Sequence, residues 1–158
     1  MLHSWRSYAL ASALVLTVSP AVAAPAIGPQ AQEIIPIEAH GGAYVVPVLI
    51  NGVLTLKFII DSGSADVSIP ADVFLTLIRA GTIGDKDYVG QKTYVLADGS
   101  TVPSQTFRIR SLKIGDVVME NVLATVASVK GDLLLGQSFL GRLKSWSIDN
   151  TAHAMIIN

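Results

Sequence analysis

The chain has 158 residues, with 11 basic and 12 acidic side chains and a formal net charge of −1 at pH 7. Because binding to a nucleic-acid backbone needs a basic face, this balance argues against a nucleic-acid partner. The chain contains no cysteine, which excludes disulfides and thiolate metal sites. The length beyond the apolar N-terminus suits one ordinary domain with its own core.

The first residues have the pattern of an export signal. Arg6 precedes an apolar run, and Ala21-Val22-Ala23 places small residues as a signal-peptide cleavage site does. The apolar run of about 11 residues is shorter than the roughly 20 that a membrane-spanning helix needs, which disfavours an uncleaved membrane anchor. We expect a signal peptide over residues 1–23, no stable membrane anchor after cleavage, and an exported protein whose compartment is the periplasm.

The mature part begins with a segment rich in Pro, Gly and Gln, expected to be a leader over residues 24–35. The folded domain is expected over residues 36–158, with strand-like character starting near Ile34. Apolar and β-branched runs between turn dipeptides such as Asn51-Gly52 predict strands. In chain order these are residues 44–50, 53–60, 67–70, 92–97, 101–109, 117–126 and 133–135, with two closing strands around Asp149-Asn150.

Helical periodicity is limited to short segments. Val73, Phe74, Leu77 and Ile78 share one face of a helix predicted over residues 72–80. Residues 137–142 could form one or two further helical turns. Many short strands at regular spacing with few helices predict an all-β barrel or sandwich.

The chemistry centres on Asp61-Ser62-Gly63-Ser64, which directly follows the apolar residues 58–60. A strand that ends in such a turn holds its carboxylate rigidly, while the glycine permits close approach and the hydroxyls can lock the turn. Taken alone, Asp-Ser-Gly is commonly no more than a polar turn. The buried strand before it, the hydroxyl of Ser64 and the downstream Leu134-Leu135-Gly136 together favour a catalytic interpretation.

With these motifs the chain resembles the retropepsin-like aspartic proteases, and more closely their single-domain bacterial members with an export signal. The resemblance rests on residues 58–64, 97–99, 134–140 and 143–149. It implies a closed acid-protease β-barrel with one or two short helices and an active site on the two-fold axis of a homodimer. It also implies an aspartic endopeptidase that cleaves a polypeptide substrate through a pair of Asp61 carboxylates, with no metal and no cofactor.

The same resemblance assigns roles around Asp61. Ser62 would brace the two turns across the axis, Gly63 would allow their close approach, and Ser64 would orient the carboxylate. Leu134-Leu135-Gly136 would pack beneath the turn and keep it rigid. The hairpin at Ala97-Asp98-Gly99 would be a flap that closes over an extended peptide and binds it by strand addition.

Other polar residues receive simpler interpretations. Asp66 adds a third acid near the turn, and a solvated side chain is favoured over one that binds a substrate main chain or a basic side chain. The segment around Ser138 lacks the glycine that a nucleophile elbow has two residues after its serine. A packing role is therefore favoured for Ser138 over a catalytic one. His40 and His153 lack carboxylate spacing that would indicate a metal site, and are expected to be ordinary loop residues.

Two alternatives to the protease hypothesis stay open. The expected flap has one glycine, Gly99, where retroviral relatives have several, so the chain could be a non-catalytic exported β-barrel that binds peptides or dimerises. The chain could also be a monomer that pairs with a different chain.

Overall fold

The computed structural model describes residues 32–158, so the expected signal peptide and most of the expected leader lie outside the described residues. The last three leader residues, 33–35, belong to the first strand, β1 (Glu33–Pro36), so the described fold begins before the expected boundary at residue 36. No helix within residues 32–158 is long and apolar enough to cross a membrane.

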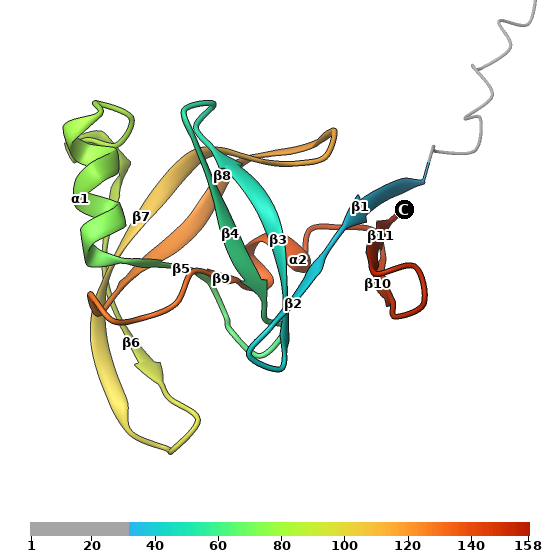
Figure 1. Cartoon of the computed structure of the whole chain (residues 1–158). Coiled ribbons are helices and arrows are strands. Elements are labelled where there is room, and N and C mark those ends of the chain that lie inside the picture. Colours follow the sequence, from blue (N-terminus) through green and yellow to red (C-terminus); the bar gives the residue numbers. More distant parts are fainter. Residues whose placement is uncertain (1–31) are drawn as a thin grey trace, which may run out of the picture.

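The described chain is mainly β (Figure 1). Its helices are α1 (Ala71–Arg79), the 3-10 turn η1 (Asp85–Asp87) and α2 (Gln137–Leu140). After β1, its strands are β2 (Glu38–His40), β3 (Ala43–Ile50), β4 (Leu54–Ile60), β5 (Val67–Pro70), β6 (Tyr88–Val95), β7 (Thr101–Ile114), β8 (Val117–Ala127), β9 (Leu134–Leu135), β10 (Trp146–Asp149) and β11 (Ala154–Ile157).

The larger sheet closes on itself. Its eight strands lie in the order β2-β3-β4-β9-β5-β8-β7-β6, and an additional pairing of β3 with β7 joins Leu49 to Lys113 and Ile50 to Leu112. The strands from β3 round to β7 therefore form a ring, from which β2 and β6 extend. The predicted closed β-barrel with one or two short helices is confirmed.

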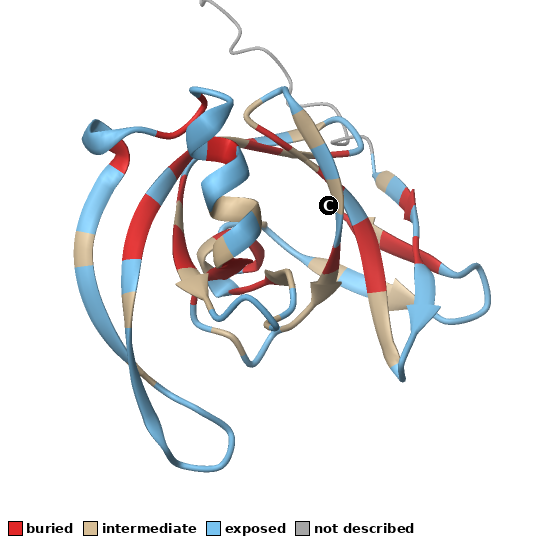
Figure 2. Ribbon diagram, turned by 60° about the vertical axis from the view of Figure 1, so that its left-hand side comes forward, coloured by how far each residue is buried: buried red, intermediate tan, exposed pale blue. Residues whose placement is uncertain are grey.

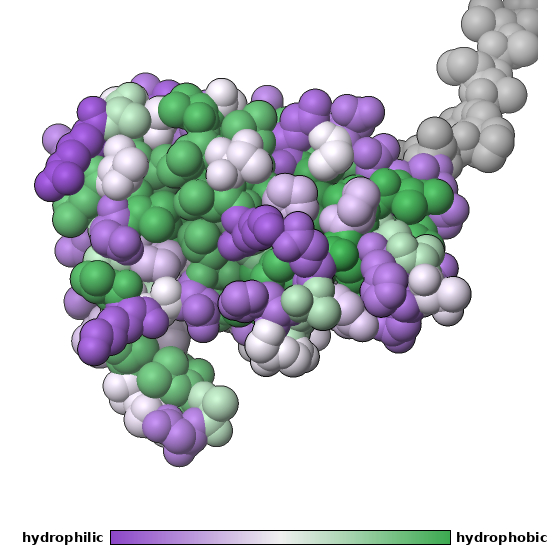
Figure 3. Space-filling view, in the orientation of Figure 1, coloured by the Kyte–Doolittle hydropathy of each residue, from purple (hydrophilic) through white to green (hydrophobic). Residues whose placement is uncertain are grey.

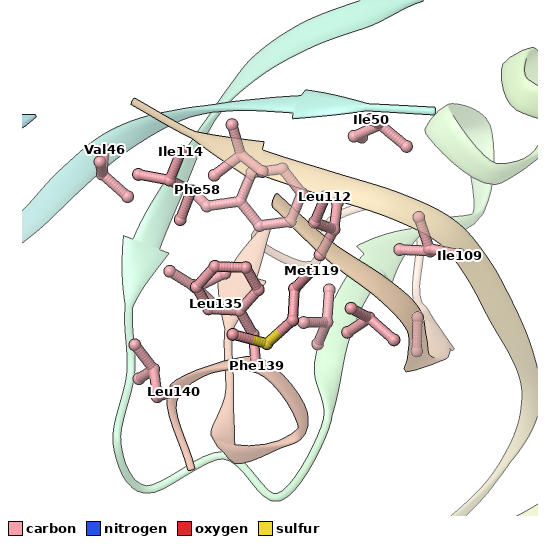
Figure 4. Close-up of a cluster of buried hydrophobic side chains, with 14 of the residues drawn as sticks. Val46, Ile50, Phe58, Ile109, Leu112, Ile114, Met119, Leu135, Phe139 and Leu140 are labelled. Atoms are coloured by element: carbon pink, nitrogen blue, oxygen red, sulfur yellow. The ribbon is translucent and has the colours of Figure 1, made fainter. Parts of the chain in front are cut away.

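The barrel interior joins the two motif regions in one core (Figure 4). Because alternate side chains of a strand face opposite sides, Phe58 points inward from β4 while its neighbours point away. Leu135 of β9 and Phe139 and Leu140 of α2 lie in the same cluster, and all four side chains are at most 1 % exposed. The Leu-Leu-Gly segment is thus packed against the strand that leads to Asp61.

A smaller sheet brings the two ends of the described chain together. β11 is its middle strand and pairs antiparallel with β1 on one side and β10 on the other. It lies to one side of the barrel in Figure 1, connected to it through β2. The side-chain amide of Gln32 donates a hydrogen bond of 3.1 Å to the Asn158 side chain, so the first described residue meets the last.

The turn and helix predictions agree with the structure within a residue or two. Asn51 and Gly52 both have positive φ angles, 49° and 70°, as a tight two-residue hairpin requires. In α1, Phe74 packs against Phe107 of β7 with ring centroids 4.6 Å apart and ring planes tilted by 43°. Residues 81–90, which follow α1, contain η1 and the start of β6 and bury Ile83 and Asp87.

Candidate active site

Asp61 is the first residue beyond β4, and main-chain hydrogen bonds fix the chain on both sides of it. The Ile59 N–H donates to the Leu133 carbonyl at 2.8 Å, and the Asp61 N–H donates to the Leu135 carbonyl at 3.2 Å. Here β9 runs parallel to β4, with Ile60 opposite Leu135. The expected support from the Leu-Leu-Gly segment is thus a strand pairing as well as side-chain packing.

The Asp61 carboxylate is half-buried and is held by the main chain of its own turn. The Gly63 N–H donates to Asp61 Oδ1 at 2.9 Å, and the Ser64 N–H donates to the Asp61 carbonyl at 3.3 Å. A Cβ atom at position 63 would lie 3.2 Å from Oδ1, tighter than ordinary packing. Glycine therefore lets the amide and the carboxylate meet.

The hydroxyl of Ser64 has a different partner from the expected one. Its Oγ donates to the Asp66 carbonyl at 2.8 Å and not to the Asp61 carboxylate, which is bound by the Gly63 amide instead. Ser64 thus closes the second half of the turn. Ser62 is exposed on the outer side of the turn, with its carbonyl bound by the side-chain amide of Gln137 at 2.8 Å.

Gly136 allows two stretches of main chain to lie against each other. A Cβ atom at this position would lie 2.6 Å from the Asp66 carbonyl carbon and 2.8 Å from the Ser64 carbonyl oxygen, distances that atoms do not adopt. The next two amides then donate into the same turn, from Gln137 to the Ser64 carbonyl at 2.9 Å and from Ser138 to the Ala65 carbonyl at 3.0 Å. The turn at Asp61 is therefore built on a direct contact between two stretches of main chain, with no side chain between them.

Two supporting side chains were not predicted as site residues. Gln137 bonds the Ser62 carbonyl, as described above, but a polar residue after a glycine gives no signal of this role. Ser138 accepts from the Val67 N–H at 2.9 Å and donates to the Leu123 carbonyl at 2.6 Å, which links the turn to β8. Both hydrogen bonds of this hydroxyl are structural, in agreement with the packing role that the sequence favours for Ser138.

The expectation of a solvated Asp66 is wrong. The residue is 5 % exposed, and its Oδ2 accepts hydrogen bonds from Lys92 Nζ at 2.9 Å and from the Tyr94 hydroxyl at 2.7 Å. Both partners lie on β6, so the β6–β7 hairpin contacts the end of the turn that follows Asp61. Burial, followed by the hydrogen bond to Asp66, raises the pKa of Tyr94 to about 12.

Ala97-Asp98-Gly99 forms the tip of this hairpin, as the sequence predicted. The Leu96 N–H donates to the Ser100 carbonyl at 2.8 Å, and Gly99 adopts a φ of 83° that favours glycine. The Asp98 carboxylate accepts from the Ser100 hydroxyl and amide, bonds that lower the pKa of Asp98. The hairpin end projects from the barrel and is almost wholly exposed (Figure 2).

The projecting hairpin has an apolar end. Val95, Leu96 and Val102 are 73 %, 48 % and 37 % exposed, and Figure 3 shows hydrophobic surface among hydrophilic residues at this end. Apolar side chains in such a position can cover a peptide.

A cavity of about 430 Å³ lies against β4, near the end of the strand that leads to Asp61. Lys57 and Ile59 line it, and Ile59 is two residues before Asp61. Other lining residues are charged or apolar, and include Glu38, which pairs with Lys57 at 2.6 Å, and His40, Val45 and Asp132. His40 thus lies on β2 at the cavity and not in an ordinary loop. Within residues 32–158, no three His, Asp or Glu side chains cluster as metal ligands.

The contact at Gly136 predicts a severe effect of one methyl group. Gly136→Ala should lower the free energy of unfolding by about 1–3 kcal/mol, because the main chain of the turn must move to admit the Cβ atom. Gly84→Ala is the matched control, since its Cβ would meet no atom within 4 Å and its φ is −148°. Urea unfolding measures both, and equal stabilities of the two variants would contradict the close contact.

The raised pKa of Tyr94 predicts a loss of stability at alkaline pH. The folded chain holds this proton more tightly than the unfolded chain, where the pKa is 10.0. The stabilisation is therefore fully present below about pH 10 and is lost as the pH rises towards about 12. Urea unfolding of the wild type and of Tyr94→Phe across this range should show the extra slope in the wild type alone. If the unfolding free energies of the two proteins run parallel across this pH range, the raised pKa of Tyr94 is contradicted.

Comparisons with known proteins agree with this geometry. A family model described as aspartyl protease matches residues 46–139, which include the turn at Asp61, the β6–β7 hairpin and Leu134-Leu135-Gly136. A search of the curated proteins found no match. Among solved structures, the fold is similar to that of a retropepsin-like aspartic protease from Rickettsia conorii, with a TM-score of 0.58 and 22 % identity over 80 % of this chain and 90 % of that chain. Since the family match spans more than half of the 158 residues, the chain belongs to the aspartyl protease family.

Proposed function

We propose that the protein is an aspartic endopeptidase whose catalytic groups are two Asp61 carboxylates, one from each subunit of a homodimer. The observation that carries the proposal is the Asp61 carboxylate, held by the Gly63 amide at the end of a buried strand. A rigid carboxylate bound by main-chain donors is what an acid–base catalyst needs for a fixed geometry. The family match supplies the reaction class.

The proposed mechanism uses one proton between two acids. Two carboxylates about 3 Å apart cannot both carry a full charge, so the pair shares a proton. The ionised member takes a proton from a bound water, which attacks the carbonyl carbon of the peptide bond. The protonated member donates a hydrogen bond to the carbonyl oxygen, where negative charge develops.

The homodimer follows from the number of active-site turns. The chain has one Asp-Ser-Gly motif, so one subunit supplies one of the two acids. An isologous dimer supplies the second acid with the same sequence. Ser62 is exposed beside Asp61, which suits the proposed contact between the two turns across the axis.

The proposed substrate is an extended polypeptide between the active-site turn and the β6–β7 hairpin. Main-chain groups near the tip would bind it by strand addition. The cavity beside Ile59 and Lys57 is large enough for a side chain next to the cleaved bond. We further propose that cleavage takes place in the periplasm, after removal of residues 1–23.

Replacement of the proposed catalytic acid is the direct test of the activity. Asp61→Asn should abolish cleavage of an unfolded protein such as casein, because the amide can neither take up nor share the proton. Its circular dichroism and unfolding midpoint should stay close to those of the wild type. A pepstatin-type inhibitor should block the wild-type activity. Undiminished cleavage by the variant would reject Asp61 as the catalyst, and a wild type that binds casein without cutting it would favour the non-catalytic module.

Mixing subunits tests whether two chains share the site. When wild-type and Asp61→Asn chains are unfolded and refolded together in equal amounts, a shared site should leave about a quarter of the activity of the same total amount of wild type, whereas independent sites should leave about half. Sedimentation should give twice the mass of one chain. Half activity together with a single-chain mass would contradict the homodimer.

A further inference from the structure

We propose that Asp66, Lys92 and Tyr94 form a flap anchor that fixes the β6–β7 hairpin relative to the active-site turn, with Asp66 as a positioning residue. The flap is the hairpin from Tyr88 to Gln105, with its tip at Ala97-Asp98-Gly99. The role in catalysis rests on the proposed protease function, but the mechanical role of the anchor does not.

The Asp66 end of the anchor belongs to the rigid turn. Its carbonyl accepts the hydroxyl of Ser64 at 2.8 Å, and its main chain packs against Gly136. The following amide, of Val67, is bound by Ser138 at 2.9 Å. Any group that bonds to the Asp66 side chain is therefore fixed relative to Asp61.

The other end belongs to the flap. Lys92 and Tyr94 are two residues apart on β6, so their side chains share one face of the strand. Both reach the same Oδ2 atom of Asp66, at 2.9 and 2.7 Å, and the Lys92 ammonium lies 5.0 Å from the centre of the Tyr94 ring. Their partners across the hairpin are Ser104 and Val102 of β7, so the anchor also fixes the second strand of the flap.

Packing does little to hold the flap. None of residues 88–105 is buried, and of these only Gly90, Tyr94 and Ser104 are even half-buried. The Asp66 side chain of the anchor is 6 % exposed, whereas that of Lys92 is 49 % exposed. A carboxylate removed from water needs its hydrogen-bond donors, so the cost of losing them favours the docked position of the flap.

The consequence for the reaction is a flap that is already ordered before the peptide arrives. A loosened flap would have to be ordered by the substrate, which weakens binding. The Asp61 carboxylate has its own main-chain support and would keep its geometry. Loss of the anchor should therefore raise KM and leave kcat nearly unchanged.

The test uses Asp66→Asn, Tyr94→Phe and their combination, each in the full chain. Hydrogen exchange of the amides in residues 91–102 should become about tenfold faster in each single variant, equivalent to about 1.4 kcal/mol. Amides of β3, β4 and β8 should not change. Because both residues act through one hydrogen bond, the effect of the double variant should be much smaller than the sum of the two single effects. Asp116→Asn is the control, since this exposed acid lies in the β7–β8 turn and pairs with Lys113.

The kinetic arm uses a quenched fluorescent peptide with a Leu-Phe centre. KM should rise about tenfold in Asp66→Asn and Tyr94→Phe, with kcat within about twofold of the wild type and no change in Asp116→Asn. Unchanged flap exchange in Tyr94→Phe, or fully additive effects, would overturn the anchor. A wild type without peptidase activity would overturn the proposed function, while the exchange data would still decide the anchor.

Discussion

The structure depends on one contact between two lengths of main chain. The segment that begins at β9 inserts between β4 and β5, and Gly136 brings its backbone against the chain from Ser64 to Asp66. This contact directs the amides of Gln137 and Ser138 into the turn and places the carbonyl of Leu135 against the Asp61 amide. Because main-chain bonds fix the turn on both sides of Asp61, the acid is held in a defined position.

The two halves of the proposed site are held in different ways. Main-chain hydrogen bonds and core packing of Phe58 and Leu135 hold the acid. The flap, by contrast, depends on two side chains that meet one carboxylate. The difference suits their proposed roles, because proton transfer needs fixed atoms, whereas a cover over the substrate must open and close.

Local patterns were sufficient to predict much of the fold. Hydrophobic runs and the Asn51-Gly52 and Asp98-Gly99 dipeptides located the hairpins, since turn conformation is decided by a few neighbouring residues. The Asp-Ser-Gly motif located the turn for a similar reason. The burial of Asp66 could not be predicted this way, because its partners at positions 92 and 94 approach only when a long hairpin folds back. The role of Gln137 likewise depends on a contact between remote parts of the chain, since its side chain bonds the Ser62 carbonyl.

The order of strands also decides when the site can exist during synthesis. Asp61 lies in the first half of the chain, but the strand that fixes its turn comes near the end, and β1 finds its partner only in the final strand, β11. Contacts between such distant segments form slowly, since a long loop must close first. A ribosome that has made Asp61 and the β6–β7 hairpin has therefore not yet made the strand that orders the turn after Asp61. The order of the strands delays formation of the candidate site until synthesis is nearly complete.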